Sequence, residues 1–244
     1  MSRRRAQSLV VTLAVVAVLA SIATYTAVSK SQGLGLDHAA PPAATADSST
    51  PPTPEAAGAA LAAQLAVIDE AQPIPDYRRD EFGTAWADIE GNGCKQRQDV
   101  LARDLVDETL DDDGCTVLTG TLHDPYTGRT IAFQHDRVAK PGNPGSQGVQ
   151  IDHIVSLSAA HAGGAWAWSP EQRERFANSL DVLIAVDGET NAAKSDRGPA
   201  EWMPADPAYV CTYATHYAEI AARWGLAVHE ADRTALIETL NTCE

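Results

Sequence analysis

The chain has 244 residues, and its 18 Lys and Arg against 33 Asp and Glu give a formal net charge of −15 at pH 7. This length suffices for one domain with a sizeable core once terminal segments are set aside. The acidic balance argues against a general nucleic-acid-binding surface, because neutralising phosphate normally requires clusters of Lys and Arg.

The N-terminal segment has the pattern of an export signal. Arginines at residues 3–5 precede an apolar run over residues 9–22, which continues more weakly to Val28. A positive n-region before such a run predicts export, with the protein secreted or anchored on the outer face of the cytoplasmic membrane. Because the run up to Val28 has about 20 residues, the length of a membrane span, an uncleaved anchor over residues 1–30 is the alternative.

The next segment is rich in Ala, Pro and Thr and has almost no bulky apolar side chain. Such a composition buries too little surface to offset the entropy of ordering. We therefore expect a disordered tether over residues 31–58 and one folded domain over residues 59–244.

The folded domain contains four cysteines: Cys94, Cys115, Cys211 and Cys243. An even count in an exported chain favours two disulfides. A zinc site made of all four thiolates is the alternative, and the absence of a C-x-x-C pair argues against it. Of the three possible pairings we favour the local one, Cys94 with Cys115 and Cys211 with Cys243.

The first half of the domain contains both helical and strand patterns. Leu61, Leu65 and Ile68 have helical spacing, and the Asp-Pro-Tyr-Thr-Gly turn at residues 124–128 is typical of a hairpin. The acidic run at 111–113 lacks an EF-hand pattern, which favours a solvated helix end. The predicted elements are helices over residues 59–70 and 96–110 and strands over residues 116–122 and 129–134.

The second half alternates short strands with helices. Ser169 followed by Pro170 is a good N-cap with a proline in the first helical position. The pattern predicts strands over residues 148–154 and 182–186, and helices over residues 158–161, 170–177, from near 189, 206–224 and 231–240. The expected architecture is α+β, a small β-hairpin-and-helix unit surrounded by helices.

Three segments of this half carry a recognisable combination of residues. A strand bears Asp152-His153, a second strand follows Asn178, and the next helix bears Asn191-Ala-Ala-Lys194-Ser-Asp, followed by Trp-Met-Pro at 202–204. At these residues the chain resembles the HNH, or ββα-metal (His-Me finger), endonuclease family. It is similar in particular to exported HNH proteins related to the C-terminal domain of GmrSD restriction endonucleases, over residues 77–243.

The resemblance implies a ββα-metal core and a catalytic role for each of these positions. His153 would be the general base, since imidazole accepts a proton near neutrality. Asp152 and Asn191 would hold a single divalent metal ion, Mg²⁺ or Mn²⁺, because both offer hard oxygen ligands. Neighbouring strand residues point to opposite faces, so Asp152 and His153 must lie at a strand end or a bulge.

The second strand departs from the usual family pattern. Many HNH proteins carry an Asn-Leu dipeptide there, whereas this chain has Asp181-Val182. Asn178, slightly upstream, is our candidate for the central position, whose family role is to fix the catalytic loop by hydrogen bonds.

Three basic residues are candidates for binding the substrate. Lys194 lies about one helical turn after Asn191, so it either contacts phosphate or is a solvated surface lysine. Arg137 and Lys140, with His135, lie in a loop rich in Gly and Pro and are expected to form a phosphate-contacting arm.

Other polar and aromatic residues are expected to be structural. The remaining histidines lack metal-ligand spacing and are assigned to the surface or to helix caps. Four tryptophans are assigned to packing, with base stacking as the alternative: Trp166, Trp168, Trp202 and Trp224. We expect Arg97, Arg103 and Asp104 to form an ion-pair lattice.

The sequence thus predicts an exported, monomeric, metal-dependent endonuclease that acts on DNA or, as a second choice, on RNA. Its membrane contact would be limited to an uncleaved N-terminal segment. A catalytically inactive extracellular binding module with the same fold is the alternative, suggested by the acidic surface and by the altered second strand. Hydrolysis of another phosphoester would use the same residues.

Overall fold

The computed structural model of the protein describes residues 54–243. The expected export segment and the expected tether up to residue 53 lie outside these residues. The first helix, α1 (Pro54–Gln64), already covers residues 54–58, which the sequence analysis assigned to the tether. Within the described residues, none of the helices has the length and apolar character needed to cross a membrane.

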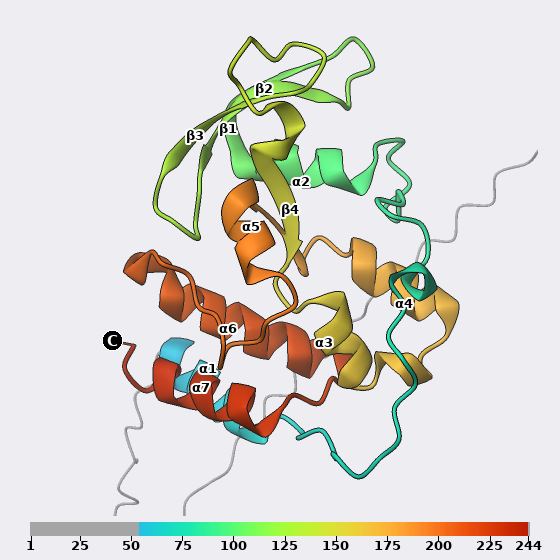
Figure 1. Cartoon of the computed structure of the whole chain (residues 1–244), viewed down its shortest axis with the longest axis vertical. Coiled ribbons are helices and arrows are strands. Elements are labelled where there is room, and N and C mark those ends of the chain that lie inside the picture. The colour runs from blue at the N-terminus through green and yellow to red at the C-terminus, as the bar shows by residue number, and fades with distance from the viewer. Residues whose placement is uncertain (1–53, 244) are drawn as a thin grey trace, which may run out of the picture. The chain divides into compact units, whose positions relative to one another are not determined.

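The described chain is a mixture of helices and short strands, as Figure 1 shows. After α1, the helices are α2 (Gln96–Asp104), α3 (Leu157–Ala162), α4 (Pro170–Asn178), α5 (Gly188–Lys194), α6 (Pro207–Trp224) and α7 (Glu230–Leu240). Short 3-10 helices are η1 (Arg79–Phe82), η2 (Gly145–Gln147) and η3 (Ala165–Ala167). The strands are β1 (Leu105–Leu110), β2 (Val117–His123), β3 (Thr130–Gln134), β4 (Val149–His153) and β5 (Leu183–Asp187).

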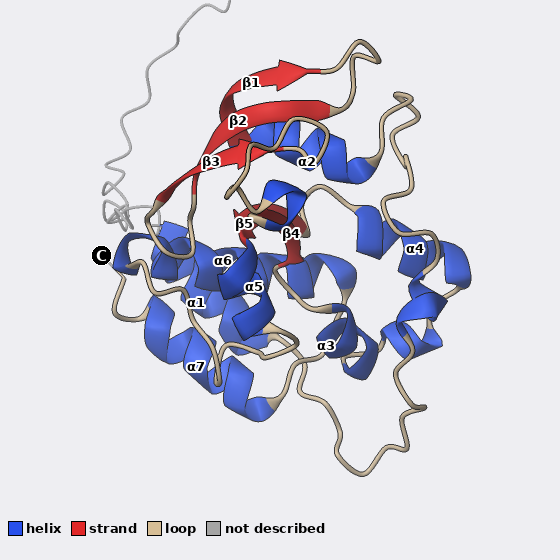
Figure 2. Cartoon of the chain, turned by 45° about the horizontal axis from the view of Figure 1, so that its top comes forward, coloured by secondary structure: helices blue, strands red, loops and turns tan. Residues whose placement is uncertain are grey.

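The strands form two separate antiparallel sheets. One has the order β1-β2-β3 and the other consists of β4 and β5. Helix α2 lies between them and contacts β1, β2 and β5, as Figure 2 shows. On the other side, α1, α6 and α7 pack on one another and form a helical layer. The fold is α+β, as predicted.

The core has two parts that follow these layers. One apolar cluster fills the space among α2, the three-stranded sheet and the β4–β5 pair, with Val100, Leu122, Phe133 and Ile151 among its buried residues. The other joins the helical layer to the rest of the domain. The β4–β5 pair therefore lies between two packed layers, which fixes its position.

The predicted helix over residues 96–110 is wrong in its second half. Helix α2 ends at Asp104, and residues 105–110 form β1, which pairs with β2. The apolar spacing of this segment fits a helix, but Val106 and Thr109 favour strands, and pairing with β2 decides the outcome. The acidic run at 111–113 therefore follows a strand and lies outside any helix end.

Both disulfides form as predicted. Cys94 bonds to Cys115, and Cys211 bonds to Cys243. The first joins the segment before α2 to the start of β2, and the second joins α6 to the segment after α7. The hairpin predicted around residues 124–128 is also confirmed, as the β2–β3 pair.

Polar side chains of α2 hold β4 and β5 through their backbones. Arg97 donates to the Val149 carbonyl oxygen at 2.9 Å, and Arg103 donates to the Leu183 carbonyl oxygen at 2.7 Å. Asp104 accepts from the backbone N–H of Ala185 at 2.8 Å. The expected ion-pair lattice is thus reduced to Arg103 with Asp104, at 2.6 Å.

The β4–β5 pair continues directly into α5. The register is regular, with Asp152 opposite Ile184 and His153 opposite Leu183. Asp187 ends β5 and caps α5 by accepting from the backbone N–H of Thr190 at 2.9 Å. Because α5 packs on both strands, Asn191 and Lys194 on one side of it face β4.

Candidate active site

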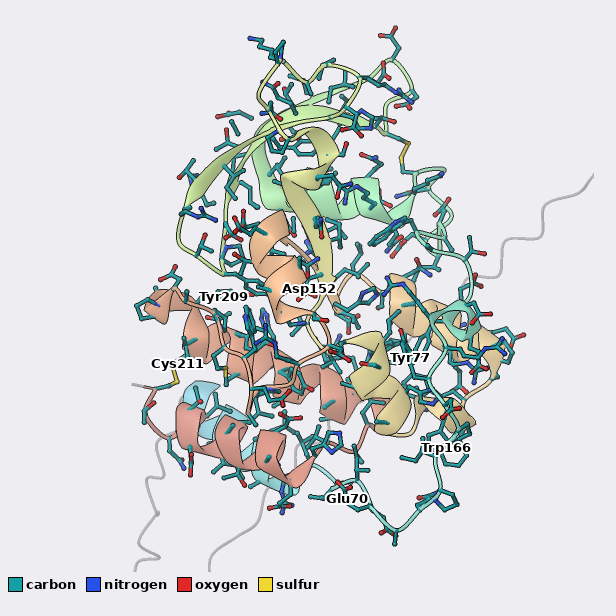
Figure 3. The ribbon with its side chains drawn as sticks, in the orientation of Figure 1. Glu70, Tyr77, Asp152, Trp166, Tyr209 and Cys211 are labelled. Carbon is teal, nitrogen blue, oxygen red and sulfur yellow. A yellow bond between two sulfur atoms is a disulfide. The ribbon has the colours of Figure 1, made fainter. Side chains whose placement is uncertain are left out.

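Asp152 is a buried carboxylate in β4, held from two sides. Tyr126, from the β2–β3 turn, donates its hydroxyl to Oδ2 at 2.6 Å. Lys194 Nζ lies 3.1 Å from Oδ1 and 3.0 Å from Oδ2. Burial raises the pKa of Asp152, and the charge of Lys194 together with the Tyr126 hydrogen bond opposes this shift. Asp152 lies at the centre of the molecule, between β4 and α5, in Figure 3.

Lys194 differs from both of the roles considered for it. Its side chain is 0% exposed, so it is neither a solvated surface lysine nor free to contact phosphate. Besides the two contacts with Asp152, its Nζ donates to the His153 carbonyl oxygen at 3.0 Å. An ammonium group has three protons, and these three acceptors match them. Lys194 therefore ties α5 to the end of β4.

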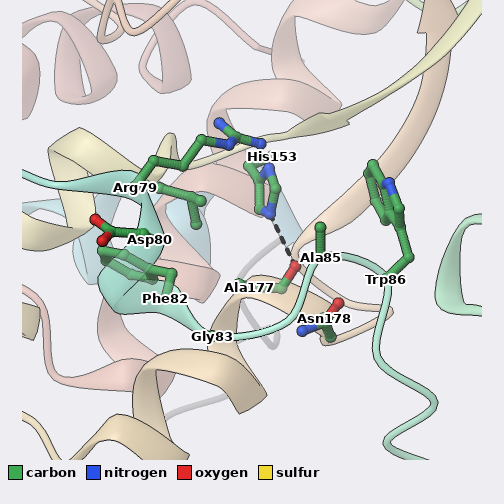
Figure 4. A pocket seen from close by; sticks show the side chains of 10 residues that line it. Arg79, Asp80, Phe82, Gly83, Ala85, Trp86, His153, Ala177 and Asn178 are labelled. Carbon is green, nitrogen blue, oxygen red and sulfur yellow. Dashed lines mark hydrogen bonds between the residues drawn. The ribbon is translucent and has the colours of Figure 1, made fainter.

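His153 is the last residue of β4, which confirms the predicted place at a strand end. Its Nε2 lies 2.8 Å from the Ala177 carbonyl oxygen, as Figure 4 shows. A carbonyl only accepts, so Nε2 carries the proton and Nδ1 carries the lone pair. Burial lowers the pKa of His153 to about 4, and the nearby Arg79 and Lys194 act in the same direction. The imidazole is therefore neutral at pH 7.

Asn191 lies on α5 and faces the same space as Asp152. Its Nδ2 donates to Gln150 Oε1 at 3.0 Å, which orients the amide. Asp152, His153, Asn191 and Ser195 line one hollow of about 360 Å³, here called the polar hollow. The structure thus brings together the predicted base and both predicted metal ligands.

Asn178 is buried at the end of α4 and fixes a turn over residues 84–87. Its Oδ1 accepts from the backbone N–H of Ala87 at 3.0 Å, and its Nδ2 donates to the Thr84 carbonyl oxygen at 3.1 Å. It also follows directly after Ala177, whose carbonyl accepts from His153. The Asn178 side chain thus bonds to the turn and not to His153, and its role as the central family residue stays a prediction.

The turn that Asn178 holds forms one wall of a second hollow. This apolar hollow, of about 380 Å³, is lined by Phe82, Ala85, Trp86 and Leu157 together with the charged Arg79 and Asp80, and it also contacts His153. The rings of Trp86 and His153 are nearly parallel, with centroids 6.5 Å apart and an interplanar angle of 20°. His153 lines both hollows and so lies between them.

The predicted phosphate-contacting arm is not part of this site. Arg137 forms an ion pair with Asp111 and lines a separate hollow beside the Cys94–Cys115 disulfide. Lys140 lines neither hollow at His153. The loop that carries both residues is tied to β3, because the backbone N–H of Lys140 donates to Gln134 Oε1 at 2.9 Å.

Three residues at the site were missed by the sequence analysis: Arg79, Tyr126 and Trp86. Tyr126 lies in the Asp-Pro-Tyr-Thr-Gly turn, which Asp124 holds by accepting from the backbone N–H groups of Thr127 and Asp187. That turn and the Ala85-Trp86 dipeptide both belong to the segment that resembles the family. This resemblance was the available signal for them, whereas nothing in the sequence singled out Arg79.

Several other assignments can be compared with the structure. Trp168, Trp202 and Trp224 pack against the core, as expected. His161 was assigned to the surface or to a cap, but it is buried, with Nε2 at 2.9 Å from the Pro75 carbonyl oxygen. It belongs to the packing beneath the segment before η1.

Comparisons with known proteins agree with this architecture. The model of the family described as GmrSD restriction endonucleases, C-terminal domain, matches residues 95–239. An uncharacterized secreted protein of Arthroderma benhamiae is 37% identical over 173 residues, which cover 70% of this chain and 78% of that protein. No solved structure matches the chain. The match over residues 95–239 includes the strand with Asp152 and His153 and the helix with Asn191, and the chain belongs to the family of GmrSD restriction endonuclease C-terminal domains.

Proposed function

We propose that the protein is an exported, metal-dependent endonuclease of the HNH type, which hydrolyses phosphodiester bonds of DNA and, as a second choice, of RNA. The family is named for restriction endonucleases, which supports nuclease activity at the family level. The observation that carries the proposal is that the neutral His153 lines one hollow with Asp152 and Asn191. In this proposal β4, β5 and α5 are the ββα-metal core.

His153 is the general base of the proposed reaction. Hydrolysis requires that a water molecule lose a proton as it attacks phosphorus, and a lone-pair nitrogen accepts that proton. The hydrogen bond from Nε2 to the Ala177 carbonyl oxygen fixes the tautomer and favours the imidazolium that forms during the reaction. Because burial keeps His153 neutral, no prior deprotonation is needed at neutral pH.

The polar hollow suits a partly hydrated, hard divalent cation. The Asp152 carboxylate and the Asn191 amide oxygen are ligands of the kind that Mg²⁺ and Mn²⁺ prefer. A carboxylate has about four lone-pair sites, so the contacts from Tyr126 and Lys194 leave it able to accept another ligand. Residues 54–243 hold no cluster of three or more His, Cys, Asp or Glu suited to a metal, which disfavours zinc.

A bound Mg²⁺ or Mn²⁺ would offset the negative charge that develops on the phosphate and on the leaving oxygen. Around it, the chain's own residues orient the ligands. Tyr126 and Lys194 hold the Asp152 carboxylate from two sides, and Gln150 holds the Asn191 amide. Loss of such supporting contacts typically lowers metal affinity by about 10- to 100-fold.

Export is supported by two features of the chain and by the description of one similar protein. The N-terminal pattern predicts an export signal, and both disulfides fit an oxidising compartment. The similar protein of Arthroderma benhamiae is itself described as secreted.

The net charge of −15 predicts modest affinity for nucleic acid, because few phosphate charges are neutralised outside the site.

The test is cleavage of supercoiled plasmid DNA by the full chain with Mg²⁺ or Mn²⁺. We expect nicked and linear products that disappear with EDTA, and a rate about 10²- to 10⁴-fold lower for His153→Ala, since that is the usual contribution of a general base. Absence of cleavage of both the plasmid and a single-stranded 12-mer of thymidylate with either metal ion, or cleavage that persists in both EDTA and His153→Ala, would sink the proposal.

A binding module without catalysis is the second candidate, and one contact favours it. Lys194 already provides a cation for Asp152, so the site is electrostatically balanced without a metal ion. Calorimetric titration with Mn²⁺ separates the candidates. The enzyme requires binding that Asp152→Asn and Asn191→Ala weaken, whereas the inert module predicts no such binding.

A further inference from the structure

The apolar hollow beside His153 has no role in the proposed hydrolysis, yet it is continuous with the catalytic residues. Arg79, His153 and Leu157 line both hollows. Its volume of about 380 Å³ lies within the roughly 300–1,000 Å³ range of small-molecule sites. A nucleotide whose phosphate enters the polar hollow would therefore place its next part, sugar and base, at the apolar one.

The turn that forms one wall of this hollow has a strained backbone. Trp86 has a φ of +59°, a conformation that bulky residues rarely adopt. Such strain persists only where the surroundings enforce it. Here α4 enforces it, because Glu174 accepts from the backbone N–H of Thr84 at 2.8 Å and Asn178 bonds to both Thr84 and Ala87. The strained turn presents the Trp86 indole to the hollow.

Gly83 shows how closely this turn approaches α4. It has a φ of +77°, and a Cβ at this position would lie 2.7 Å from the Glu174 side chain. The chain can therefore enter the turn at residue 83 only as glycine. The turn is exposed at residues 83–85, and its contacts with α4 hold turn, helix and indole together as one preorganised unit.

Arg79 supplies a charge at the boundary between the hollows. Figure 4 shows Arg79 and Trp86 on opposite sides of the His153 ring. Among residues 54–243 no carboxylate forms an ion pair with Arg79, whereas its neighbour Arg78 pairs with Asp80 at 3.0 Å. A guanidinium without a carboxylate partner, next to an aromatic wall, matches the two parts of a nucleotide, phosphate and base.

Resting on the proposed function, we infer that the apolar hollow is a nucleobase subsite, in which an unpaired base adjoining the scissile phosphate stacks on Trp86 while Arg79 contacts that phosphate. A base within a duplex is already stacked and paired, so its faces are not available to Trp86. A single-stranded base has both faces free, and stacking on an aromatic side chain is tolerant of sequence. The substrate class is therefore single-stranded or locally unpaired nucleic acid.

Binding without cleavage tests this inference directly. The probe is a fluorescein-labelled 12-mer of thymidylate, titrated with the full chain in Ca²⁺, and in EDTA if Ca²⁺ allows cleavage, by fluorescence anisotropy. We expect it to bind at least tenfold more tightly than its duplex with 12-mer adenylate. Trp86→Ala should remove about tenfold of this affinity, which is the usual effect of losing one stacked base, and Trp86→Phe should retain most of it.

Two controls keep the outcome interpretable. Trp166→Ala removes a tryptophan that lies well apart from Asp152 in Figure 3, and it should bind as the unchanged protein does. A 12-mer of abasic deoxyribose phosphates tests the role of the bases on the unchanged protein, so the result does not depend on whether Trp86→Ala folds. We expect this probe to bind about tenfold more weakly than the thymidylate.

Equal binding of the thymidylate and abasic probes, or preference for the duplex, would overturn the subsite. If plasmid cleavage still depended on His153, the nuclease proposal would stand without it. Conversely, tight binding of thymidylate through Trp86 without any cleavage would retain the subsite and refute the nuclease.

Discussion

The Nε2 of His153 donates its proton to the Ala177 carbonyl oxygen across 2.8 Å, so a residue of β4 is fixed by the backbone at the end of α4. This contact decides which ring nitrogen is basic. It also couples the orientation of the base to Asn178, the next residue, whose side chain holds the turn of Trp86. Base, indole and helix end thus form one connected arrangement.

Burial of His153 predicts a pH dependence of stability. The folded pKa of about 4 lies below the ordinary value of 6.5, so between these pH values the unfolded chain binds the proton and the folded chain does not. The contribution of the neutral His153 to the free energy of unfolding is therefore fully present above pH 6.5 and is lost as the pH falls through 4. The difference between the two pKa values corresponds to a loss on the order of 3 kcal/mol.

Urea denaturation between pH 4 and 7, in EDTA, measures this dependence. His153→Gln has no proton to gain in this range, so its free energy of unfolding should fall less than that of the unchanged protein, by about the same 3 kcal/mol. Parallel curves for the two proteins would show that His153 does not titrate as a buried neutral group.

Lys194 should be a major contributor to stability. Its ammonium is fully buried against Asp152, and removing one partner of a buried ion pair typically costs about 3–5 kcal/mol. We expect Lys194→Met to lower the free energy of unfolding by this amount, as measured by urea denaturation. Lys140→Met is the matched control, because Lys140 is exposed and its loss should cost about 0.5 kcal/mol or less. Equal effects of the two substitutions would contradict the buried pair.

Asn178 should act as a positioning residue through the turn of Trp86. In Asn178→Ala the backbone N–H of Ala87 loses its acceptor, so its hydrogen exchange, followed by NMR, should accelerate. Loss of the contacts of a buried amide should also lower the free energy of unfolding by about 1–3 kcal/mol. Asn241→Ala, at an exposed position, should change neither quantity. An unchanged exchange rate at Ala87 would refute this role.

Arg79 and Arg78 are adjacent and should differ in their effect on cleavage. Arg79→Ala should lower kcat/KM about tenfold to a hundredfold, because a charge-assisted hydrogen bond to phosphate contributes about 1.5–3 kcal/mol. It should also reduce the slope of log affinity against log salt by about 0.7 for a single strand. Arg78→Ala removes a surface ion pair with Asp80 and should do neither. If both substitutions had the same effect, Arg79 would have no specific phosphate contact.

Most of the fold was predictable because the local patterns are strong. Ser169 and Pro170 marked the start of α4, and the turn at residues 124–128 marked the β2–β3 hairpin. Residues 105–110 were assigned wrongly because their apolar spacing suits a helix, and only pairing with β2 makes them a strand. That pairing depends on chain folding at long range and leaves no local signal.

The candidate site was predictable only in part. Asp152, His153 and Asn191 were found through their resemblance to a family, and the structure places them around one hollow. The burial of Lys194 depends on where Asp152 meets α5, which the sequence does not state. Trp86 and Arg79 reach His153 from a segment about 70 residues earlier, and their conformations depend on α4.

The hydrogen bonds from α2 to the β4–β5 pair have an evolutionary consequence. Arg97, Arg103 and Asp104 bond to main-chain groups of β4, β5 and the segments just before them, so they hold these strands whatever side chains the strands carry. Substitutions on the two strands are therefore free to alter the hollows without displacing the strands themselves. Such an arrangement lets related proteins diversify the molecules they recognise while the position of His153 is inherited unchanged.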